Sequence, residues 1–471
     1  MTLVLDLPTE IFLEVVRFLE LPDPISLLLT CSSLYSLSTQ RSFWISALET
    51  TRMKSPIACP PHANLSRFTL ETLKGLVFSW QKLQDNWNQP YPKIACVTST
   101  HFQAPPEILA SLQGTDILVL TTGDSVLCWD SKLATPCPFP AIEIGVIDSV
   151  SFTESPGIYS IALLTQKLGN TGTHSEHRYI LTIKHEDGKV VSFTNRVSDV
   201  SISNSGDSNL LFLTEDVVGS IMTGDDEEQC IITVDEVNSN NPLLDSTSVL
   251  RLHRSVSTDR DLMECFTYKE HLYNLIEDGR SVQIQHISRR SLRAGHCEES
   301  SRFISEKAFS GNDFDPLFYP FRTLLPSTPR YGIGAIFVRI KEDEEDDLRS
   351  LTSFTFLPSS LTHSSDDDVS SPLAFDSPSV VALVPGWVLG HNHVWSDHSG
   401  SNIGAVVQTE ADPPRLVLVR YHPDIMSTSV HALAVPDTID LEELDGLCVD
   451  DATGAVHLVD NEGVLSTIRY V

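Results

Sequence analysis

Residues 7–20, with the sequence LPTEIFLEVVRFLE, predict the first helix of the fold. Proline is tolerated in the first turn of a helix, and a carboxylate there suits the positive end of the helix dipole. Pro8 and Glu10 therefore predict that a helix begins here. The apolar residues that follow recur at spacings of three and four, which predicts a wide apolar stripe on a helix ending near Glu20. The stripe consists of Ile11, Phe12, Val15, Val16, Phe18 and Leu19.

Two further short helices are predicted directly after the first. Asp23 followed by Pro24 repeats the start signal and leads into an apolar run at 25–29. Ser32 or Ser33 can cap a third helix, and an apolar segment at 43–48 continues the supply of core residues. Three short helices hold more apolar surface than they can bury among themselves, so a partner or the rest of the chain should cover part of it.

In order and spacing, these residues resemble the F-box. The matching positions are Leu7, Pro8, Glu10, Ile11, Val15, Phe18, Leu19, Asp23, Leu28, Cys31, Leu34, Phe43 and Trp44. In that family the helices dock on the S-phase-kinase-associated adaptor, which joins the receptor to a cullin scaffold carrying the RING subunit and the ubiquitin-conjugating enzyme. The resemblance therefore implies a substrate receptor of an SCF-type ubiquitin ligase.

The resemblance also implies roles for individual residues. Carried over by position, the adaptor contacts are Leu7, Pro8, Ile11, Leu28 and Cys31, whereas Val15, Leu19, Leu34 and Trp44 belong to the core. Cys31 stands where the family more often has valine, and cysteine is a small apolar residue when it is buried. The alternative is that these helices are only a cap on the larger domain.

The next segment is predicted to connect the F-box to the remainder of the chain. Residues 51–63 contain three prolines and have turn composition. From 66 to 88 the periodicity is helical again, with one apolar face. That face comprises Leu73, Leu76, Val77, Trp80, Leu83 and Trp87. We expect this amphipathic helix to pack the F-box (1–50) against the domain that follows the linker (51–93).

After residue 93 the pattern changes to short apolar or alternating runs separated by glycine and aspartate turns, which indicates antiparallel strands. Hairpins are predicted at 117–130, 179–193 and 272–287, and three strands at 446–470. About 378 residues of successive hairpins suit radial repetition better than one sandwich of ~100 residues. The fold class is therefore α+β multidomain, with an all-β domain at 94–471 that is a degenerate β-propeller of seven or eight blades, at ~40–50 residues per blade.

One short motif and the overall layout agree with a propeller. Trp129-Asp130 at a strand end is similar to the Trp-Asp step of WD repeats, although it occurs once and no Gly-His pair precedes it by a blade's length. The layout of F-box, helical linker and WD-repeat-like β region resembles a group of F-box proteins of mushroom-forming fungi.

Charge and cysteine content limit the classes of partner. Residues 1–93 hold eight acidic and eight basic residues, so the net charge of −31 falls entirely on residues 94–471. Nucleic acid and anionic membranes attract positively charged proteins, so neither is expected as a partner. A basic client protein is favoured instead. The nine cysteines form no Cys-x-x-Cys pair, and the start of the chain does not read as a signal peptide. A reducing compartment is therefore expected, which is the cytoplasm, the nucleus or both.

Two further features of the β region are candidates for binding. Acidic runs at 225–228, 342–347 and 366–368 are interpreted first as solvated loops, and second as elements that attract a basic client or flank phosphorylation at Ser364 and Ser365. A patch of Trp387, His391, His393 and Trp395 is the candidate client site, because tryptophan is frequent at interface hot spots. Two histidines alone are too few for a metal site, so no metal is assigned.

The chain shows none of the local motifs of hydrolases, phosphate-binding loops or zinc proteases, and no cofactor is predicted. The sequence thus favours a non-catalytic receptor that binds the adaptor through the F-box and a client through the β domain. Two alternatives stay open: a scaffold that binds the adaptor without a role in ubiquitination, and a propeller enzyme with a helical cap, since propellers can carry sites built from dispersed residues.

Overall fold

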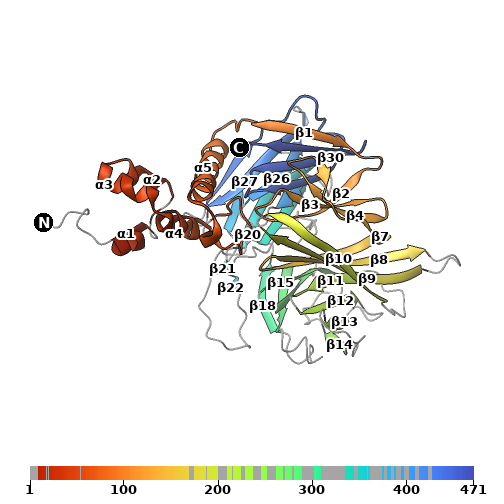
Figure 1. Cartoon of the computed structure of the whole chain (residues 1–471). Helices are drawn as coiled ribbons and strands as arrows, with labels where there is room; N and C mark the ends of the chain where they lie inside the picture. The colour runs from red at the N-terminus through yellow and green to blue at the C-terminus, as the bar shows by residue number, and fades with distance from the viewer. Residues whose placement is uncertain are drawn as a thin grey trace.

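The computed structural model describes residues 9–168 apart from 17, 18, 20, 53 and 54, residues 413–471 apart from 423–426, and between these blocks the strands named below with residues 188, 214, 216 and 288. Helices form the N-terminal part and antiparallel strands form the rest (Figure 1). The first helices project away from the sheets, so the molecule consists of a helical arm and a β domain. Among the described helices, none is long and apolar enough to cross a bilayer.

The arm contains more helical segments than the four predicted. The bounds are α1 (Thr9–Val16), α2 (Pro22–Leu28), α3 (Ser32–Tyr35), the 3-10 turn η2 (Ser36–Thr39), α4 (Arg41–Arg52), the 3-10 turn η3 (Leu65–Arg67) and α5 (Leu70–Trp87). The predicted third helix is divided, because Gln40 adopts an extended backbone (φ −92°, ψ 124°) after η2. Phe43 and Trp44 therefore lie on a separate helix of 12 residues.

The core of the arm is built around α4. Phe43 and Trp44 are fully buried, and their rings meet edge to face with centroids 5.2 Å apart. The indole N–H of Trp44 donates to the carbonyl of Ser38 at 2.8 Å, which satisfies its one polar atom. The same cluster includes Leu73 and Val77 of α5, so the linker helix shares a core with α1–α4.

The β domain contains thirty-one described strands. The first ten are β1 (Cys96–His101), β2 (Pro106–Ser111), β3 (Ile117–Thr122), β4 (Ser125–Asp130), β5 (Thr135–Pro136), β6 (Ile142–Glu143), β7 (Val146–Ser155), β8 (Ile158–Leu168), β9 (His174–Glu186) and β10 (Lys189–Asp199). Then come β11 (Asn209–Leu213), β12 (Val217–Thr223), β13 (Gln229–Glu236), β14 (Ser246–Arg251), β15 (Asp261–Tyr268), β16 (His271–Glu277), β17 (Ser281–Ile287), β18 (Arg302–Ala308), β19 (Ala335–Asp343) and β20 (Leu348–Leu357). The last are β21 (Ser359–Ser360), β22 (Ala374–Phe375), β23 (Ser379–Ala382), β24 (Trp387–Val388), β25 (Val394–Ser396), β26 (Asn402–Gln408), β27 (Arg415–His422), β28 (Ser427–Ala432), β29 (Leu444–Asp450), β30 (Ala455–Asp460) and β31 (Val464–Arg469). The predicted hairpins are present as β3–β4, β9–β10 and β16–β17, and the predicted C-terminal strands as β29–β31.

These strands form successive antiparallel sheets. Among the described residues, seven sheets have three or more strands, and β21–β22 form a separate pair. The seven consist of β2–β6, β7–β10, β11–β14, β15–β18, β19 with β20 and β23, β24–β28, and β29–β31 with β1. Each sheet is therefore made almost entirely from one continuous segment of chain, which is the arrangement of propeller blades.

The first strand of the domain belongs to the last sheet. β1 pairs antiparallel with β31 from Cys96↔Arg469 to His101↔Val464, although the two strands are more than 360 residues apart in sequence. The hydroxyls of Ser99 and Ser466 are hydrogen bonded across this pair at 2.9 Å. The β domain therefore joins its two ends in one sheet, which makes it propeller-like in topology as well as in composition.

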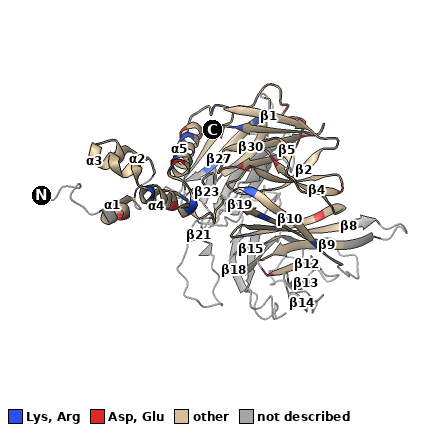
Figure 2. Cartoon of the chain, in the orientation of Figure 1, with Lys and Arg blue, Asp and Glu red and all other residues tan. Residues whose placement is uncertain are grey.

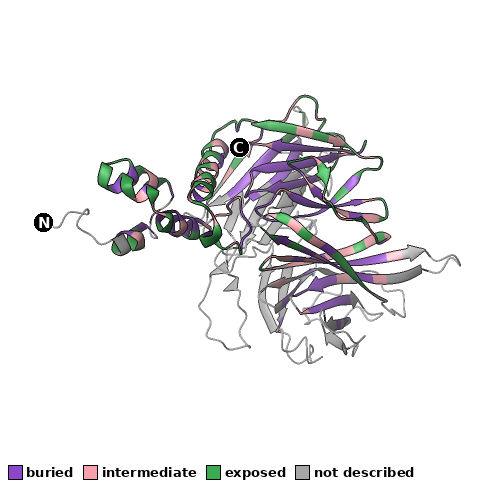
Figure 3. Ribbon diagram, in the orientation of Figure 1, coloured by how far each residue is buried: buried purple, intermediate pink, exposed green. Residues whose placement is uncertain are grey.

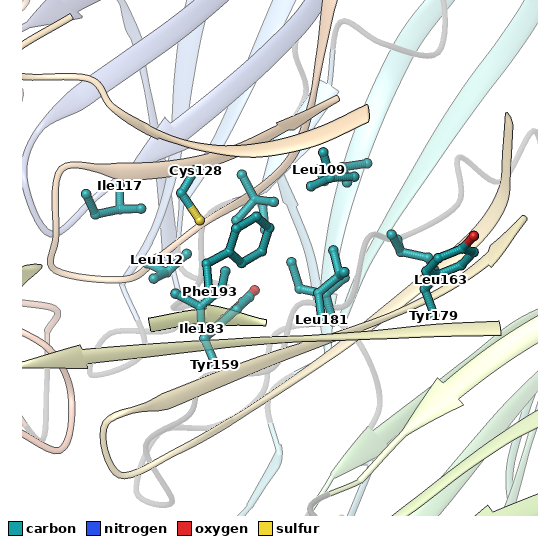
Figure 4. Packing of buried hydrophobic residues seen from close by; sticks show 14 of the residues in the cluster. Leu109, Leu112, Ile117, Cys128, Tyr159, Leu163, Tyr179, Leu181, Ile183 and Phe193 are labelled. Carbon is teal, nitrogen blue, oxygen red and sulfur yellow. The ribbon is translucent and has the colours of Figure 1, made fainter. Parts of the chain in front are cut away.

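Both faces of β3 are buried, because its sheet packs between two neighbouring sheets. In β3, Ile117 and Val119 contribute to a cluster with β8–β10, whereas Leu118 and Leu120 contribute to a cluster with β30 and β31. Figure 4 shows the first cluster, where Leu109, Leu112, Ile117 and Cys128 face Tyr159, Leu181, Ile183 and Phe193. Strands with two buried faces have continuous apolar runs, and Figure 3 shows them as the buried interior of the domain.

A tight contact at Gly114 joins the arm to the β domain. Gly114 lies between β2 and β3 with φ +69°, and a Cβ added there would overlap the carbonyl oxygen of Cys59 in the connector. Gly123 has a similar φ of +59° but open space around it. The two glycines therefore form a matched pair, of which only Gly114 is also a packing contact.

We expect Gly114→Ala to destabilise the chain by about 2–5 kcal/mol, because it adds backbone strain and displaces Cys59. Gly123→Ala should cost only the left-handed strain of about 1–2 kcal/mol. Equilibrium denaturation of the two variants measures the difference. Equal losses would mean that the connector does not pack on this turn as described.

Candidate functional site

The far end of the arm carries exposed apolar side chains. Ile11 and Val15, one helical turn apart on α1, are 49% and 43% exposed, and Leu29 and Tyr35 at the ends of α2 and α3 are 74% and 59% exposed. Residues four apart lie on one helix face, so Ile11 and Val15 form a continuous apolar strip. Figure 3 shows the exposed positions on these helices, and Figure 2 shows few charges on α2 and α3.

The five predicted adaptor contacts are placed differently from one another. Ile11 is exposed and Cys31 is half-buried, so both side chains can reach a partner. Leu28 is 4% exposed and belongs to the core of the arm, which corrects the expectation that it faces outward. Leu7 and Pro8 lie outside the described residues.

The predicted core set also differs at one position. Leu34 and Trp44 are buried as expected, and Leu19 is half-buried. Val15 is exposed rather than buried, because Phe12 and Val16 are the residues of α1 that face the core. An eight-residue helix that packs on one side turns only part of its wide apolar stripe inward, and the sequence pattern alone does not say which part.

The predicted client patch is described only in its backbone. Trp387 and Trp395 lie on two short strands, β24 and β25, that both pair with β26, opposite Gln408 and Gly404 respectively. His391 and His393 lie outside the described residues. The backbone thus brings the two tryptophans to one sheet, and the patch itself stays a prediction.

The acidic runs fall mostly outside the described part of the chain. Residues 225–228, 344–347 and 364–368 are not described, and Glu342 and Asp343 end strand β19. Within the described residues, no group of three or more His, Cys, Asp or Glu side chains is arranged to hold a metal ion.

The thiols of Cys59 and Cys137 are not in disulfides, and burial raises the pKa of each thiol to about 11.

The sequence did not indicate the polar junction between α5 and the β domain. Arg420 of β27 donates to the side-chain oxygens of Asn88 at 2.8 Å, Gln84 at 2.5 Å and Asn402 at 3.2 Å. Asn402 in turn donates to Asp451 at 3.2 Å. Arg420 and its α5 partners are more than 330 residues apart, so no spacing pattern could have joined them.

Around this junction, α5 is also held by apolar packing and backbone contacts. Leu83 and Trp87 are buried in a cluster with residues of β26, β27 and β29–β31. A Cβ on Gly454 would lie 2.5 Å from Leu83 Cδ1, which shows how closely the β29–β30 turn approaches the helix. Asn86 donates to the carbonyl of Tyr470 and accepts from the amide of Lys93. The end of α5 is therefore fixed to the last sheet from several sides.

A buried carboxyl group lies in the same turn. Asp450 is 1% exposed and accepts the backbone N–H groups of Ala452 and Thr453 at 2.9 and 3.2 Å. Burial, with the neighbouring Asp451 as a second cause, raises the pKa of Asp450 to about 7. A carboxyl group whose pKa is higher in the folded than in the unfolded state stabilises the fold below the unfolded pKa, and this contribution is lost as the pH rises through about 7.

We therefore expect the free energy of unfolding to increase by roughly 2 kcal/mol from this group when the pH is lowered from 8 to 5. Asp450→Asn keeps an acceptor oxygen and removes the titration, so its unfolding free energy should be higher than wild type at pH 8 and similar at pH 5. Urea denaturation at both pH values measures this. Parallel pH profiles for the two proteins would contradict the assignment.

Comparisons with known proteins give structural neighbours at low identity. No family model matches the chain, and no curated protein matches it. Solved structures similar to it include the β-propeller domain of Myceliophteria thermophila Cps50 (Swd1), with 13% identity, a TM-score of 0.43 and coverage of 79% of this chain and 99% of that one. The WD40 domain of SCAP from fission yeast is also similar, with 8% identity, a TM-score of 0.40 and coverage of 80% and 98%. These two neighbours are thus described as a β-propeller domain and a WD40 domain.

Proposed function

We propose that this chain is the substrate-recognition subunit of an SCF-type ubiquitin ligase. In this proposal residues 1–50 of the arm are an F-box that binds the S-phase-kinase-associated adaptor, and through it a cullin–RING assembly, in the cytoplasm or the nucleus. The chain itself performs no chemistry, and the ubiquitin is transferred by other subunits.

The observation that carries the proposal is the exposed apolar strip at the tip of a projecting arm. Exposed apolar residues that are grouped together are typical of interaction sites. Ile11 and Val15 sit within the stretch whose sequence resembles the F-box, at the end of the arm away from the sheets. The sequence resemblance and the exposure of the apolar side chains are two independent observations, and both support α1 as the docking helix.

The β domain is the proposed binding module for a client protein. The pairing of β1 with β31 and the order of the sheets support a closed ring of seven blades. The net charge of −31 on residues 94–471 favours a basic client. The arm and the β domain then hold two partners at opposite ends of one molecule.

The experiment is affinity purification of the tagged full-length chain with and without proteasome inhibition, followed by mass spectrometry. We expect recovery of the adaptor together with a cullin, and client proteins whose abundance rises on inhibition. Recovery of the adaptor without any cullin would favour the scaffold without a ubiquitination role. Recovery of neither would overturn the proposed function.

A further inference from the structure

We infer that Arg420 is a positioning residue that sets the orientation of the helical arm relative to the β domain. The geometry of the junction supports this role directly, whereas its consequence for ubiquitin transfer rests on the proposed function.

The C-terminal end of α5 lacks a cation of its own. The last turn of this helix, which is described in full, contains no basic residue, and Asn88 is its C-cap. The C-terminal end of a helix carries a partial negative charge, which a cation placed there stabilises. Arg420 lies beside this end from β27, so the β domain supplies the charge that the helix sequence does not.

The contacts of Arg420 also fix the orientation of the C-terminal end of α5. Gln84 and Asn88 are four residues apart and therefore lie on one face of the end of the helix, and the guanidinium donates to both. The guanidinium carbon lies 5.8 Å from the centroid of the Trp87 ring, between these two positions. A planar group with donors in fixed directions can hold a helix against rotation as well as translation.

On its other side, Arg420 is held by the sheet. Its Nε donates to Asn402, which is its direct partner in the β26–β27 ladder. Asn402 is tied to Asp451 in the β29–β30 turn, so two neighbouring sheets hold the guanidinium in place. Arg420 is only 9% exposed, so water competes little for these bonds.

The rest of the arm follows the orientation of α5. α4 and α5 share one core, and the indole N–H of Trp80 donates to the hydroxyl of Ser55 in the connector at 3.1 Å. A small rotation at the end of α5 is therefore transmitted to the tip, where Ile11 and Val15 lie. Arg420 does not touch the tip and acts on it only through the helix.

The test compares arm orientation in four full-length proteins. Nitroxide labels are attached through genetically encoded ketone amino acids, which leaves the nine cysteines unchanged, at Tyr35 of the arm and Leu133 of the β domain. Both positions are exposed, at 59% and 69%. Electron–electron double resonance then gives the distribution of distances between them in wild type, Arg420→Met, Arg420→Lys and the matched control Arg415→Met, an exposed arginine on the same strand.

We expect one narrow distribution for wild type and Arg415→Met. Arg420→Met should shift it or at least double its width. Arg420→Lys should be broadened as well, because lysine keeps the charge but cannot reproduce the fork that reaches both Gln84 and Asn88. A distribution for Arg420→Met that equals the wild type would overturn the inference.

If Arg420→Met does not fold, the double variant Gln84→Ala/Asn88→Ala decides the question. It removes the two acceptors on α5 and leaves the bond between Arg420 and Asn402 in place. Broadening in this variant supports the inference and a wild-type distribution overturns it. The double variant Gln81→Ala/Lys82→Ala, on the same helix at positions other than the two acceptors named above, is its control.

A second measurement concerns ubiquitin transfer and rests on the proposed function. In a ligase reconstituted with purified adaptor, cullin, RING subunit and conjugating enzyme, Arg420→Met should bind the adaptor within twofold of wild type. The rate at which lysines of its own β domain are modified should fall fivefold or more. If wild type does not bind the adaptor, the proposed function fails, while the distance distributions still decide the role of Arg420.

Discussion

Replacement of Trp87 by alanine is expected to lower the free energy of unfolding by about 3–5 kcal/mol, because the change leaves a large cavity in the core. Trp87 is fully buried at the end of α5, in the cluster that α5 shares with the last two sheets. Its ring also faces the guanidinium of Arg420, so the variant loses a cation–π contact together with the packing.

The measurement is urea denaturation of the full-length chain followed by circular dichroism. Phe78→Ala is the matched control, since Phe78 is an aromatic residue of the same helix that is 46% exposed. It should lose less than about 1.5 kcal/mol, because only about half of the Phe78 side chain is buried in the folded state. Equal losses in the two variants would show that α5 does not dock on the β domain through Trp87.

The double variant Ile11→Lys/Val15→Lys is expected to weaken binding to the purified adaptor at least 100-fold, which is about 2.7 kcal/mol or more. Two charges would then stand where the proposal requires two apolar side chains to be buried, and burying a charge without a partner is costly. Both residues are more than 40% exposed in the free chain, so the fold should remain intact.

The control for this variant carries the same chemistry at a distant place. Leu133→Lys/Val146→Lys also adds two lysines at exposed apolar positions, which are 69% and 64% exposed on the β domain. It should bind the adaptor like wild type. Undiminished binding by the Ile11/Val15 variant, with thermal melts unchanged, would mean that the strip on α1 is not the docking surface.

The helices were largely predictable because their signals are local. The apolar face of residues 66–88 follows a 3.6-residue period, and α5 buries Leu73, Val77, Leu83 and Trp87 from that face. The break between α3 and α4 was missed, because the serines and threonine at 36–39 are compatible with a helix. The structure instead forms a 3-10 turn there, followed by the extended Gln40.

The strands were predictable as elements, whereas their partners were not. Turn residues such as Gly188 and Gly454, both with positive φ, mark hairpins that any sequence reading can find. The pairing of β1 with β31 depends on contacts between the two ends of the domain, and neither strand carries a signal for the other. The same holds for which face of a strand such as β3 packs against which neighbouring sheet.

Only part of the candidate site could be predicted from the sequence. Ile11 was predicted to be a contact, and its exposure agrees with that role. Leu28 was predicted to be a contact and is buried, whereas Val15 was predicted to be a core residue and is exposed. The packing of the helices in the arm decides which residues are buried, and the sequence pattern does not show it. The role of Arg420 could not be predicted from the sequence, because it depends on contacts with a helix that is distant in sequence.

Whether residues 1–50 act as an F-box is measured by calorimetric titration of the full-length chain with the purified adaptor. We expect a one-to-one complex with a dissociation constant of about 1 μM or tighter. Absence of binding at adaptor concentrations up to roughly 50 μM, which limits the binding free energy to less than about 6 kcal/mol, would contradict it.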